Sequence, residues 1–243
     1  MQSLELDEVY HMDCLEGMAM LPDASIDLIY CDLPYGVTEN EWDSVISFEP
    51  LWEQYNRLIK DRGAIVLHSQ QPFTTDLINS NRKHFRYTWV WSKSLATGAL
   101  NVKRRPMREH EDICVFYKRL GTYNPQMRKG KMRINKGKEI TSSNYKRGYT
   151  IRPRKSDLYY PKSIIHCPAT RRKGQHPTEK PVPLAEYLIK TYTNPGEVVL
   201  DNCLGSGTTA LAAENTGRHW IGFETEARYV EMARERLRQN REK

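Results

Sequence analysis

The sequence predicts one α/β domain with a mostly parallel sheet, and three observations support this fold class. The 243 residues can bury one large core, and single α/β domains often have this length. Short runs rich in β-branched and aromatic residues alternate with helical patterns along most of the chain. Gly63, Gly196 and Gly217 stand at the ends of these patterns, where the chain is expected to turn.

The predicted strands and helices alternate as a parallel sheet with flanking helices requires. Strands are expected at 8–12, 27–32, 64–69, 87–91, 113–117, 198–201 and 219–224. Helices are expected at 51–59, 183–192, 208–215 and 227–239. The last helix carries Tyr229, Val230, Ala233 and Leu237 on one face, so this face is expected to pack on the sheet.

Between Leu120 and Cys167 the periodicity fades, and the segment is rich in Lys, Arg, Asn, Gly, Pro and Tyr. Its tyrosines include Tyr123, Tyr145, Tyr149, Tyr159 and Tyr160. A solvated loop is one interpretation of this composition. The tyrosines favour another, because rings between Arg and Lys can stack on bases while the cations bind phosphates. The segment is therefore predicted to be an insertion rather than part of the sheet.

The charge is concentrated in the middle of the chain. The formal net charge is +7 and the isoelectric point is about 9.1, which indicates an anionic partner. The stretch 101–175 contains 21 Lys and Arg against 5 Asp and Glu, so it carries +16 while the rest of the chain carries −9. The anionic partner is therefore expected to bind mainly to this stretch.

The cysteines and the apolar runs exclude several classes of protein. The cysteines are Cys14, Cys31, Cys114, Cys167 and Cys203. They form no C-x-x-C pair and lack the spacing of a zinc site, so they are expected to be reduced and mostly buried, with no metal. No signal-peptide pattern is present, and no apolar run approaches the roughly 20 residues of a membrane span. A cytoplasmic protein with no membrane partner is expected.

The segment VLDNCLGSGTTALAAENTGRHWIGFE, residues 199–224, is predicted to form a strand, a glycine turn, a helix and a second strand. Gly205 and Gly207 would let a ligand approach the backbone closely at a helix N-terminus. Glu224 follows Gly205 by 19 residues, near the roughly 20 that are typical of an acid binding ribose hydroxyls. The motif predicts a nucleoside-containing ligand and, taken alone, also fits NAD. A P-loop is not expected, because no Lys follows the glycines.

Only one helix is predicted after Glu224, so the other strands of this sheet must come from earlier in the chain. If the N-terminal strands supply them, the fold is circularly permuted. The end of the strand at 27–32 then faces the glycine loop across the ligand crevice. That strand ends in Asp32-Leu33-Pro34-Tyr35-Gly36, so both motifs are expected to share one site.

The sequence Asp32-Leu33-Pro34-Tyr35 suits the methylation of an aromatic amine, whose lone pair is delocalised into its ring. The Asp32 carboxylate and the Leu33 carbonyl can each accept one amine N–H, and both favour the electron-rich nitrogen of the transition state. Pro34 favours an extended Leu33 and so fixes the direction of that carbonyl. The Tyr35 ring can stack on the base.

These motifs resemble those of amino-methylating DNA methyltransferases. DLPY resembles their Asp-Pro-Pro-Tyr motif, and DNCLGSGTT resembles their S-adenosylmethionine loop. HPTEKPVPL at 176–184 and HMDCLEGMAMLPDASIDLIY at 11–30 resemble two further family segments. The order of catalytic motif, basic insertion and cofactor loop is that of the permuted β group. Leu33 replaces the usual first Pro, and Asn202-Cys203 replaces the usual Pro-Phe of the cofactor loop.

The resemblance implies a circularly permuted, Rossmann-like methyltransferase fold that uses S-adenosylmethionine. It implies a catalytic part at 1–119, a basic target-recognition insertion at 120–167 and a cofactor-binding part at 168–243. Its implied catalytic residues are Asp32, Leu33, Pro34 and Tyr35. Its implied cofactor-binding residues are Asp13, Cys14, His176, Thr178, Lys180, Asp201, Gly205, Ser206, Gly207, Thr208, Thr209 and Glu224. DNA contacts are expected from Lys103, Arg104, Arg105, Arg108, Lys129, Lys131 and Lys138.

The expected reaction is methylation of N6 of an adenine that is flipped out of double-stranded DNA. Asp32 favours adenine over cytosine, because the family's cytosine enzymes more often carry Ser at that position. N4-cytosine methylation, RNA adenine methylation, a catalytically silent DNA-binding protein and an NAD-dependent oxidoreductase are the alternatives. The resemblance suggests a bacterial or phage protein and a homodimer, and it leaves open a cognate restriction endonuclease.

Overall fold

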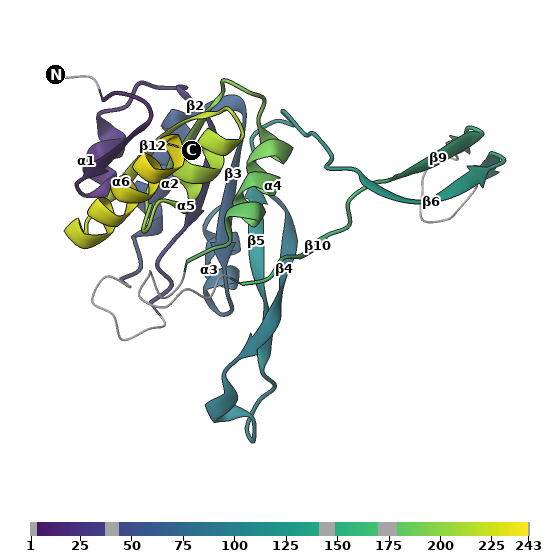
Figure 1. Ribbon diagram of the computed structural model, residues 1–243, viewed down its shortest axis with the longest axis horizontal. Helices are drawn as coiled ribbons and strands as arrows, with labels where there is room; N and C mark the ends of the chain where they lie inside the picture. The colour runs from purple at the N-terminus through teal and green to yellow at the C-terminus, as the bar shows by residue number, and fades with distance from the viewer. Residues whose placement is uncertain (1–3, 37–43, 141–148, 170–178, 243) are drawn as a thin grey trace. The chain divides into compact units, whose positions relative to one another are not determined.

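The computed structural model describes residues 4–36, 44–140, 149–169 and 179–242. The chain divides into two compact units (Figure 1). The first unit comprises Met1–Asn124 and Ser163–Lys243, and the second comprises Pro125–Lys162. His176 and Thr178, which the sequence implies for the cofactor, lie outside the described residues.

The first unit is built on an eight-stranded sheet with the strand order β1-β12-β11-β2-β3-β5-β4-β10. Its strands are β1 (Glu8–His11), β2 (Ile26–Asp32), β3 (Ile59–Ser69), β4 (Phe85–Thr97), β5 (Arg108–Phe116), β10 (Ile164–His166), β11 (Val198–Asp201) and β12 (His219–Glu224). β5 runs antiparallel to β3 and β4, and all other neighbouring pairs in this sheet are parallel. The predicted α/β class with a mostly parallel sheet is confirmed.

The strand order shows the circular permutation directly. β12 and β11 come from the C-terminal part of the chain, yet they lie between the first two strands, β1 and β2. β11 pairs with β2 in parallel through Val199↔Leu28 and Leu200↔Ile29, so both strands end at the same edge of the sheet. The segments that follow these strands, the glycine loop and Asp32–Gly36, therefore emerge side by side.

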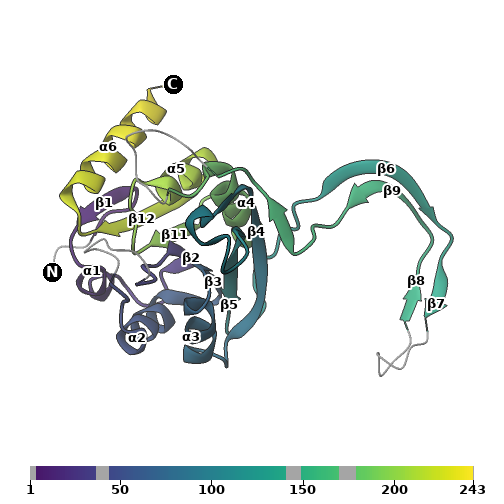
Figure 2. The same ribbon diagram turned by 90° about the horizontal axis from the view of Figure 1, so that it is seen from below.

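Helices cover both faces of the sheet (Figures 1 and 2). One face carries α1 (Cys14–Ala19), α2 (Phe48–Leu58) and α3 (Phe73–Ser80), and the other carries α4 (Val182–Tyr192), α5 (Thr208–Asn215) and α6 (Ala227–Arg241). The core residues of β2 alternate between the two faces. Leu28 and Tyr30 pack under α4, α5 and α6, whereas Ile29 and Cys31 pack under α1, α2 and α3. This explains the continuous apolar run that predicted the strand.

Two helices and one strand of this unit escaped the sequence prediction. α1 has only six residues and starts at a cap, where Asp13 accepts hydrogen bonds from two backbone amides. α3 is rich in residues with low helix propensity, and it is held by the buried side chains of Phe73, Thr74 and Leu77. β10 lies inside the predicted insertion, but it pairs with β4 and belongs to the main sheet.

The second unit contains two small antiparallel sheets. β6 (Arg128–Asn135) pairs with β9 (Arg154–Tyr159), and β7 (Lys138–Ile140) pairs with β8 (Tyr149–Ile151). Neither small sheet joins the main sheet. The sequence did not predict these strands. All eight residues of β6 are exposed, so the alternation of a half-buried strand is missing.

The five cysteines are free; Cys14, Cys31 and Cys114 are buried, and Cys167 and Cys203 are partly buried. Among the described residues, we find no helix with the length and apolar character of a membrane span.

Candidate active site

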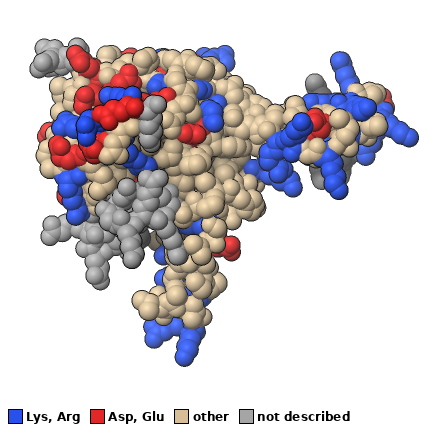
Figure 3. Space-filling model, viewed as in Figure 1, with Lys and Arg blue, Asp and Glu red and all other residues tan. Residues whose placement is uncertain are grey.

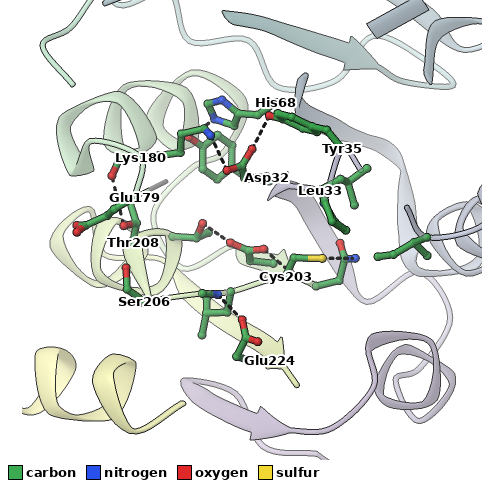
Figure 4. Close-up of a pocket in the computed structure, with 18 of the residues that line it drawn as sticks. Asp32, Leu33, Tyr35, His68, Glu179, Lys180, Cys203, Ser206, Thr208 and Glu224 are labelled. Atoms are coloured by element: carbon green, nitrogen blue, oxygen red, sulfur yellow. Dashed lines mark hydrogen bonds and ion pairs between the residues drawn. The ribbon is translucent and has the colours of Figure 1, made fainter. Parts of the chain in front are cut away.

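A cavity of about 890 Å³ lies at the edge of the sheet where β2 and β11 end. Asp32, Leu33, Pro34 and Tyr35 line it together with the glycine loop after β11 and Glu224 at the end of β12 (Figure 4). Residues of β4 and β5 also line the cavity. The volume of the cavity is near the upper end of the about 300–1,000 Å³ typical of small-molecule sites, so the cavity can hold a nucleoside-sized ligand and further groups.

Asp32 is the centre of the polar contacts at one end of the cavity (Figure 4). Tyr35 donates a hydrogen bond from its hydroxyl to Oδ1 at 2.5 Å, and Lys180 donates one from Nζ to Oδ2 at 2.5 Å. The Asp32 side chain keeps 26% of its surface exposed. The carboxylate is thus held by two donors and is still accessible from the cavity.

Lys180 also approaches a second carboxylate, so four charged groups alternate in sign. Its Nζ lies 3.3 Å from Oε2 of Glu111, whose Oε1 accepts a hydrogen bond from Lys93. Burial opposes the charge on Lys180, but Asp32 and Glu111 outweigh it and raise the pKa of Lys180. Burial likewise opposes the charge on Glu111, but Lys180 and Lys93 lower its pKa to about 2. Lys180 and Glu111 therefore stay charged at neutral pH.

His68 lies beside this network and is neutral. It is fully buried at the end of β3, and its Nε2 is 2.8 Å from the hydroxyl of Tyr30. Burial and the positive charge of Lys180 lower the pKa of His68 to about 4. Its Nδ1 has no hydrogen-bond partner among the described residues, although the side chain lines the cavity.

The other end of the cavity is built by the glycine loop and Glu224. Gly205 and Gly207 have φ angles of 54° and 81°, which only glycine adopts readily. Glu224 accepts hydrogen bonds from the backbone N–H of Gly205 at 2.7 Å and of Glu226 at 2.8 Å. The carboxylate of Glu224 is therefore fixed at the cavity wall, where its remaining lone pairs can accept ligand hydroxyls.

Asp201 and Gly207 stabilise the conformation and packing of the glycine loop. Asp201 accepts hydrogen bonds from Thr209 Oγ1 at 2.5 Å and from the N–H of Cys203 at 3.0 Å, so it ties the two sides of the turn together. Burial raises the pKa of Asp201 to about 6. Gly207 is absent from the cavity lining; a Cβ there would lie 2.9 Å from that of Ala233, so the glycine allows α5 and α6 to pack closely.

The remaining implied cofactor residues also reach this cavity. Asp13, Cys14, Ser206, Thr208 and Thr209 line it. The Oδ1 of Asp13 caps α1, accepting hydrogen bonds from the N–H groups of Leu15 and Glu16. Lys180 lines the cavity too, but its ammonium is directed at Asp32 and Glu111, away from Glu224.

The residues predicted to contact DNA occupy two places. Lys103, Arg104 and Arg105 are exposed in the turn between β4 and β5, and Arg108 lines the cavity at the start of β5. Lys129, Lys131 and Lys138 are exposed in the second unit. Figure 3 shows Lys and Arg gathered on that unit and at the end of the β4–β5 turn.

Sequence reasoning missed His68, Lys93 and Glu111. Each stands in or next to an apolar strand segment, and their contacts depend on β5 pairing between β3 and β4, out of chain order. The available signal was the charge itself, because Lys93 and Glu111 each stand two positions from a buried apolar residue of their strand, Trp91 and Ile113.

The known proteins that this chain matches are DNA methyltransferases. A family of DNA methylases, N6_N4_Mtase, matches residues 26–235. The type II methyltransferase M.BamHI of Bacillus amyloliquefaciens is 30% identical over 253 residues, which cover 96% of this chain and 57% of that protein. The chain thus spans little more than half the length of this relative.

Two further matches differ in the base that their names specify. The DNA adenine methyltransferase YhdJ of Escherichia coli is 25% identical, over 96% of this chain and 83% of YhdJ. The solved structure of the PvuII DNA methyltransferase, described as cytosine-N4-specific, superimposes with a TM-score of 0.69 at 17% identity. That superposition covers 94% of this chain and 85% of the PvuII chain, and it shows that the two share a fold.

Proposed function

The chain belongs to this family of DNA methylases, which modify exocyclic amino groups, and on that premise we propose that it methylates N6 of adenine in double-stranded DNA. S-adenosylmethionine is the methyl donor of this reaction. The observation that carries the proposal is the position of Asp32. Its carboxylate is held by Tyr35 and Lys180, is accessible from the cavity, and lies in the same cavity as Glu224 and the glycine loop.

The described residues fit the cofactor. The carboxylate of Glu224 would hold its ribose hydroxyls, and the glycine loop would bind its amino-acid end at the N-terminus of α5. Asp13 and Cys14 would contact its adenine. When bound, the cofactor supplies a methyl group on a sulfonium, which is electrophilic without further activation.

Asp32 and the Leu33 carbonyl would bind the target amine as paired acceptors. An ionised carboxylate has about four lone-pair sites, and Tyr35 and Lys180 use two of them, so one amine N–H can still be accepted. Leu33 is 3% exposed and its side chain packs in the core, which holds its backbone in place. Once methylated, the amine nitrogen is cationic and acidic, so its proton can leave along the hydrogen bond to Asp32.

A paired base cannot reach Asp32 in this cavity, so the proposal includes flipping of the target adenine. Flipping costs a few kcal/mol, and stacking on Tyr35 would offset part of this. The ring of Tyr35 is well placed for that role, because its hydroxyl is bound to Asp32 and the ring packs 5.1 Å from that of Phe73.

The second unit would supply much of the affinity for DNA. Residues 125–162 contain 12 Lys and Arg against 2 Asp and Glu, so the unit is strongly cationic. A cognate restriction endonuclease is part of the proposal, since several relatives are named type II methyltransferases. The homodimer is proposed from the family resemblance.

N4 methylation of cytosine is the second candidate, because the PvuII structure has this fold and a cytosine-N4 description. To distinguish the two, the protein is incubated with tritiated S-adenosylmethionine and either duplex DNA or RNA, and the labelled nucleosides are separated. Label in N6-methyladenine is expected. Label in N4-methylcytosine would replace the first proposal with the second, and label in RNA alone would reject both. If no DNA is labelled, the alternative of a catalytically silent DNA-binding protein would stand.

A further inference from the structure

β4 and β5 continue as a two-stranded ribbon past the edge of the sheet (Figure 1). Their last pair is Thr97↔Arg108, whereas β3 ends at Ser69, opposite Asp112 of β5, and β10 ends opposite Ser92 of β4. β4 runs in the same direction as β2 and β11, so the ribbon leaves the sheet at the edge where the cavity lies. We call residues 98–107, which join the two strands, the finger.

The root of the ribbon is also a wall of the cavity. The lining residues from β4 and β5 are Trp91, Lys93, Leu95, Thr97, Arg108 and Glu111. Arg108 stands three positions before Glu111, so at about 3.3 Å per residue the finger starts about 10 Å from the ion pairs around Asp32. This is close to the depth of a DNA groove, about 8.5 Å. A duplex that delivers a base to the cavity would therefore meet the finger.

The finger presents large apolar side chains to solvent. Leu100 is 101% exposed, Val102 is 53% exposed and Met107 is 41% exposed. Single exposed apolar residues are common on protein surfaces, but three within one ten-residue turn that makes no core are not. Such a group indicates a surface that is covered when a partner binds.

The turn that carries Leu100 is ordered by its own hydrogen bonds. The N–H of Asn101 donates to the carbonyl of Gly98 at 3.0 Å, and the N–H groups of Arg104 and Arg105 donate to the carbonyl of Asn101 at 2.9 and 3.0 Å. Gly98 has a φ of 93°, which allows the reversal. Leu100 is thus presented by a formed 3₁₀ turn.

The charges beside the apolar residues identify the partner. Lys103, Arg104 and Arg105 follow Val102 directly, and the finger contains no Asp or Glu. A protein partner would be served by the apolar side chains alone, whereas phosphates on both sides of a base step require cations next to an apolar wedge. The charge pattern therefore favours DNA over a second copy of the chain.

On the basis of the proposed DNA methylation, we infer that Leu100 enters the base stack of the duplex and fills the space that the flipped target base leaves. Lys103, Arg104 and Arg105 bind the flanking phosphates and hold the finger in the groove. Leu100 is then a positioning residue: it acts on the duplex and touches neither the cofactor nor the reacting amine.

The test compares Leu100→Ala with the wild-type chain on two duplexes that contain the mapped methylation site. In one duplex the target base is paired, and in the other it lies opposite an abasic site and needs no unpairing. We expect Leu100→Ala to lower kcat/KM at least about tenfold on the paired duplex and less than about threefold on the other. Leu100→Met should restore most of the rate.

Leu6→Ala is the matched control, because Leu6 is 45% exposed, precedes β1 and is absent from the cavity lining. It should leave both rates unchanged. 2-Aminopurine at the target position gives a readout without methyl transfer, and its fluorescence increase on binding should be reduced in Leu100→Ala only.

Equal losses on the two duplexes, or no loss on either, would overturn the inference. So would a change of oligomeric state of Leu100→Ala without DNA, which would place a second copy of the chain on the finger. The ratio of the two rates tests the finger whichever base carries the methyl group, whereas the identity of the methylated nucleoside tests the proposed function.

Discussion

Lys180 and Asp32 form a partly buried ion pair across 148 residues of sequence, and the same ammonium lies 3.3 Å from Glu111. This arrangement ties the segment just before α4 to β2 and β5, at the point where the target amine would bind. The candidate site thus contains groups that would act on the amine and groups that would hold the cofactor, and the two sets can be tested separately by mutation.

Asp32→Ala should abolish methyl transfer and leave cofactor binding nearly intact, because Asp32 lies at the end of the cavity away from Glu224. Loss of one such acceptor costs on the order of 3 kcal/mol, or more than about a hundredfold in rate. Methyl-transfer rates and calorimetry with S-adenosylmethionine check this. Asp23→Ala removes an exposed carboxylate outside the cavity and should be silent. A folded Asp32→Ala protein that no longer binds the cofactor would refute the assignment.

Lys180→Met should lower both the rate and the stability, because it leaves Glu111 with Lys93 alone and frees Asp32 to change orientation. Breaking a buried pair costs about 3–5 kcal/mol, which denaturant unfolding can measure. The affinity for S-adenosylmethionine should change less than about threefold. Strongly weakened cofactor binding in a folded variant would instead support the cofactor role that the sequence motif implied for Lys180.

Glu224→Ala should weaken cofactor binding, because the carboxylate would otherwise hold the ribose hydroxyls through charge-assisted hydrogen bonds worth about 1.5–3 kcal/mol. It also releases the N–H of Gly205, so the glycine loop loses an anchor. Titration calorimetry should show the loss, and saturating cofactor should restore much of the rate. A variant whose rate stays low at saturation would place Glu224 in the chemical step.

Acid should destabilise the protein through Glu111. Its pKa is about 2 in the folded chain and 4.5 ordinarily, so the unfolded chain takes up the proton first. The stabilisation is complete above about pH 4.5 and is lost as the pH falls toward 2, by about 3 kcal/mol in all. Unfolding free energies from pH 6 to pH 2.5 should fall less steeply in Glu111→Gln. If the unfolding free energies of the wild type and Glu111→Gln fall in parallel with pH, the lowered pKa of Glu111 would be contradicted.

Neutralising Lys129, Lys131 and Lys138 together should weaken binding to all duplexes alike. The slope of log K for DNA binding against log salt concentration should become shallower by an amount that corresponds to up to about three phosphate contacts. The control replaces Arg82, Lys83 and Arg119 by Gln. These residues lie at the end of β4 and β5 that is remote from the finger. An unchanged slope in the lysine variant would show that the second unit does not grip the phosphates.

A replacement of the whole insertion, 120–167, by that of a related enzyme should move the methylated sequence without changing the methylated atom. The reason is that Asp32, the Leu33 carbonyl and Tyr35 would select the amine, whereas Tyr and Asn side chains in the insertion would contact base edges. Sequencing of the methylated sites gives both answers. An unchanged recognition sequence would locate base readout elsewhere, with 103–110 as the first region to test.

The parts of the site that could be predicted are those that a short stretch of chain encodes. Asp32-Leu33-Pro34-Tyr35 and the loop from Asp201 to Thr209 each follow a strand, and the geometry of a strand end is local. Their meeting followed from the permuted order, since a sheet that includes both strands must bring their carboxyl ends to one edge.

The parts that could not be predicted depend on pairings that skip along the chain. Glu111 faces Trp91 only because β5 is inserted between β3 and β4. Lys180 reaches Asp32 only after α4 has packed on the opposite side of β2 from α2. The strands of the second unit were missed for another reason: their residues are exposed on both faces, so burial leaves no periodic trace in the sequence.

The insertion of β11 and β12 between β1 and β2 has a consequence for synthesis. As the ribosome releases the chain, β2, β3, β4 and β5 can assemble from the first 116 residues, because the pairs β2–β3, β3–β5 and β5–β4 involve no later strand. The edge of β2 must then wait for residues 198–201, more than eighty positions later, before a neighbour arrives. An unpaired edge of this kind recruits other chains, so the nascent protein is most prone to aggregation during that interval. Rare codons or low temperature that slow translation between 117 and 197 should therefore lower its yield.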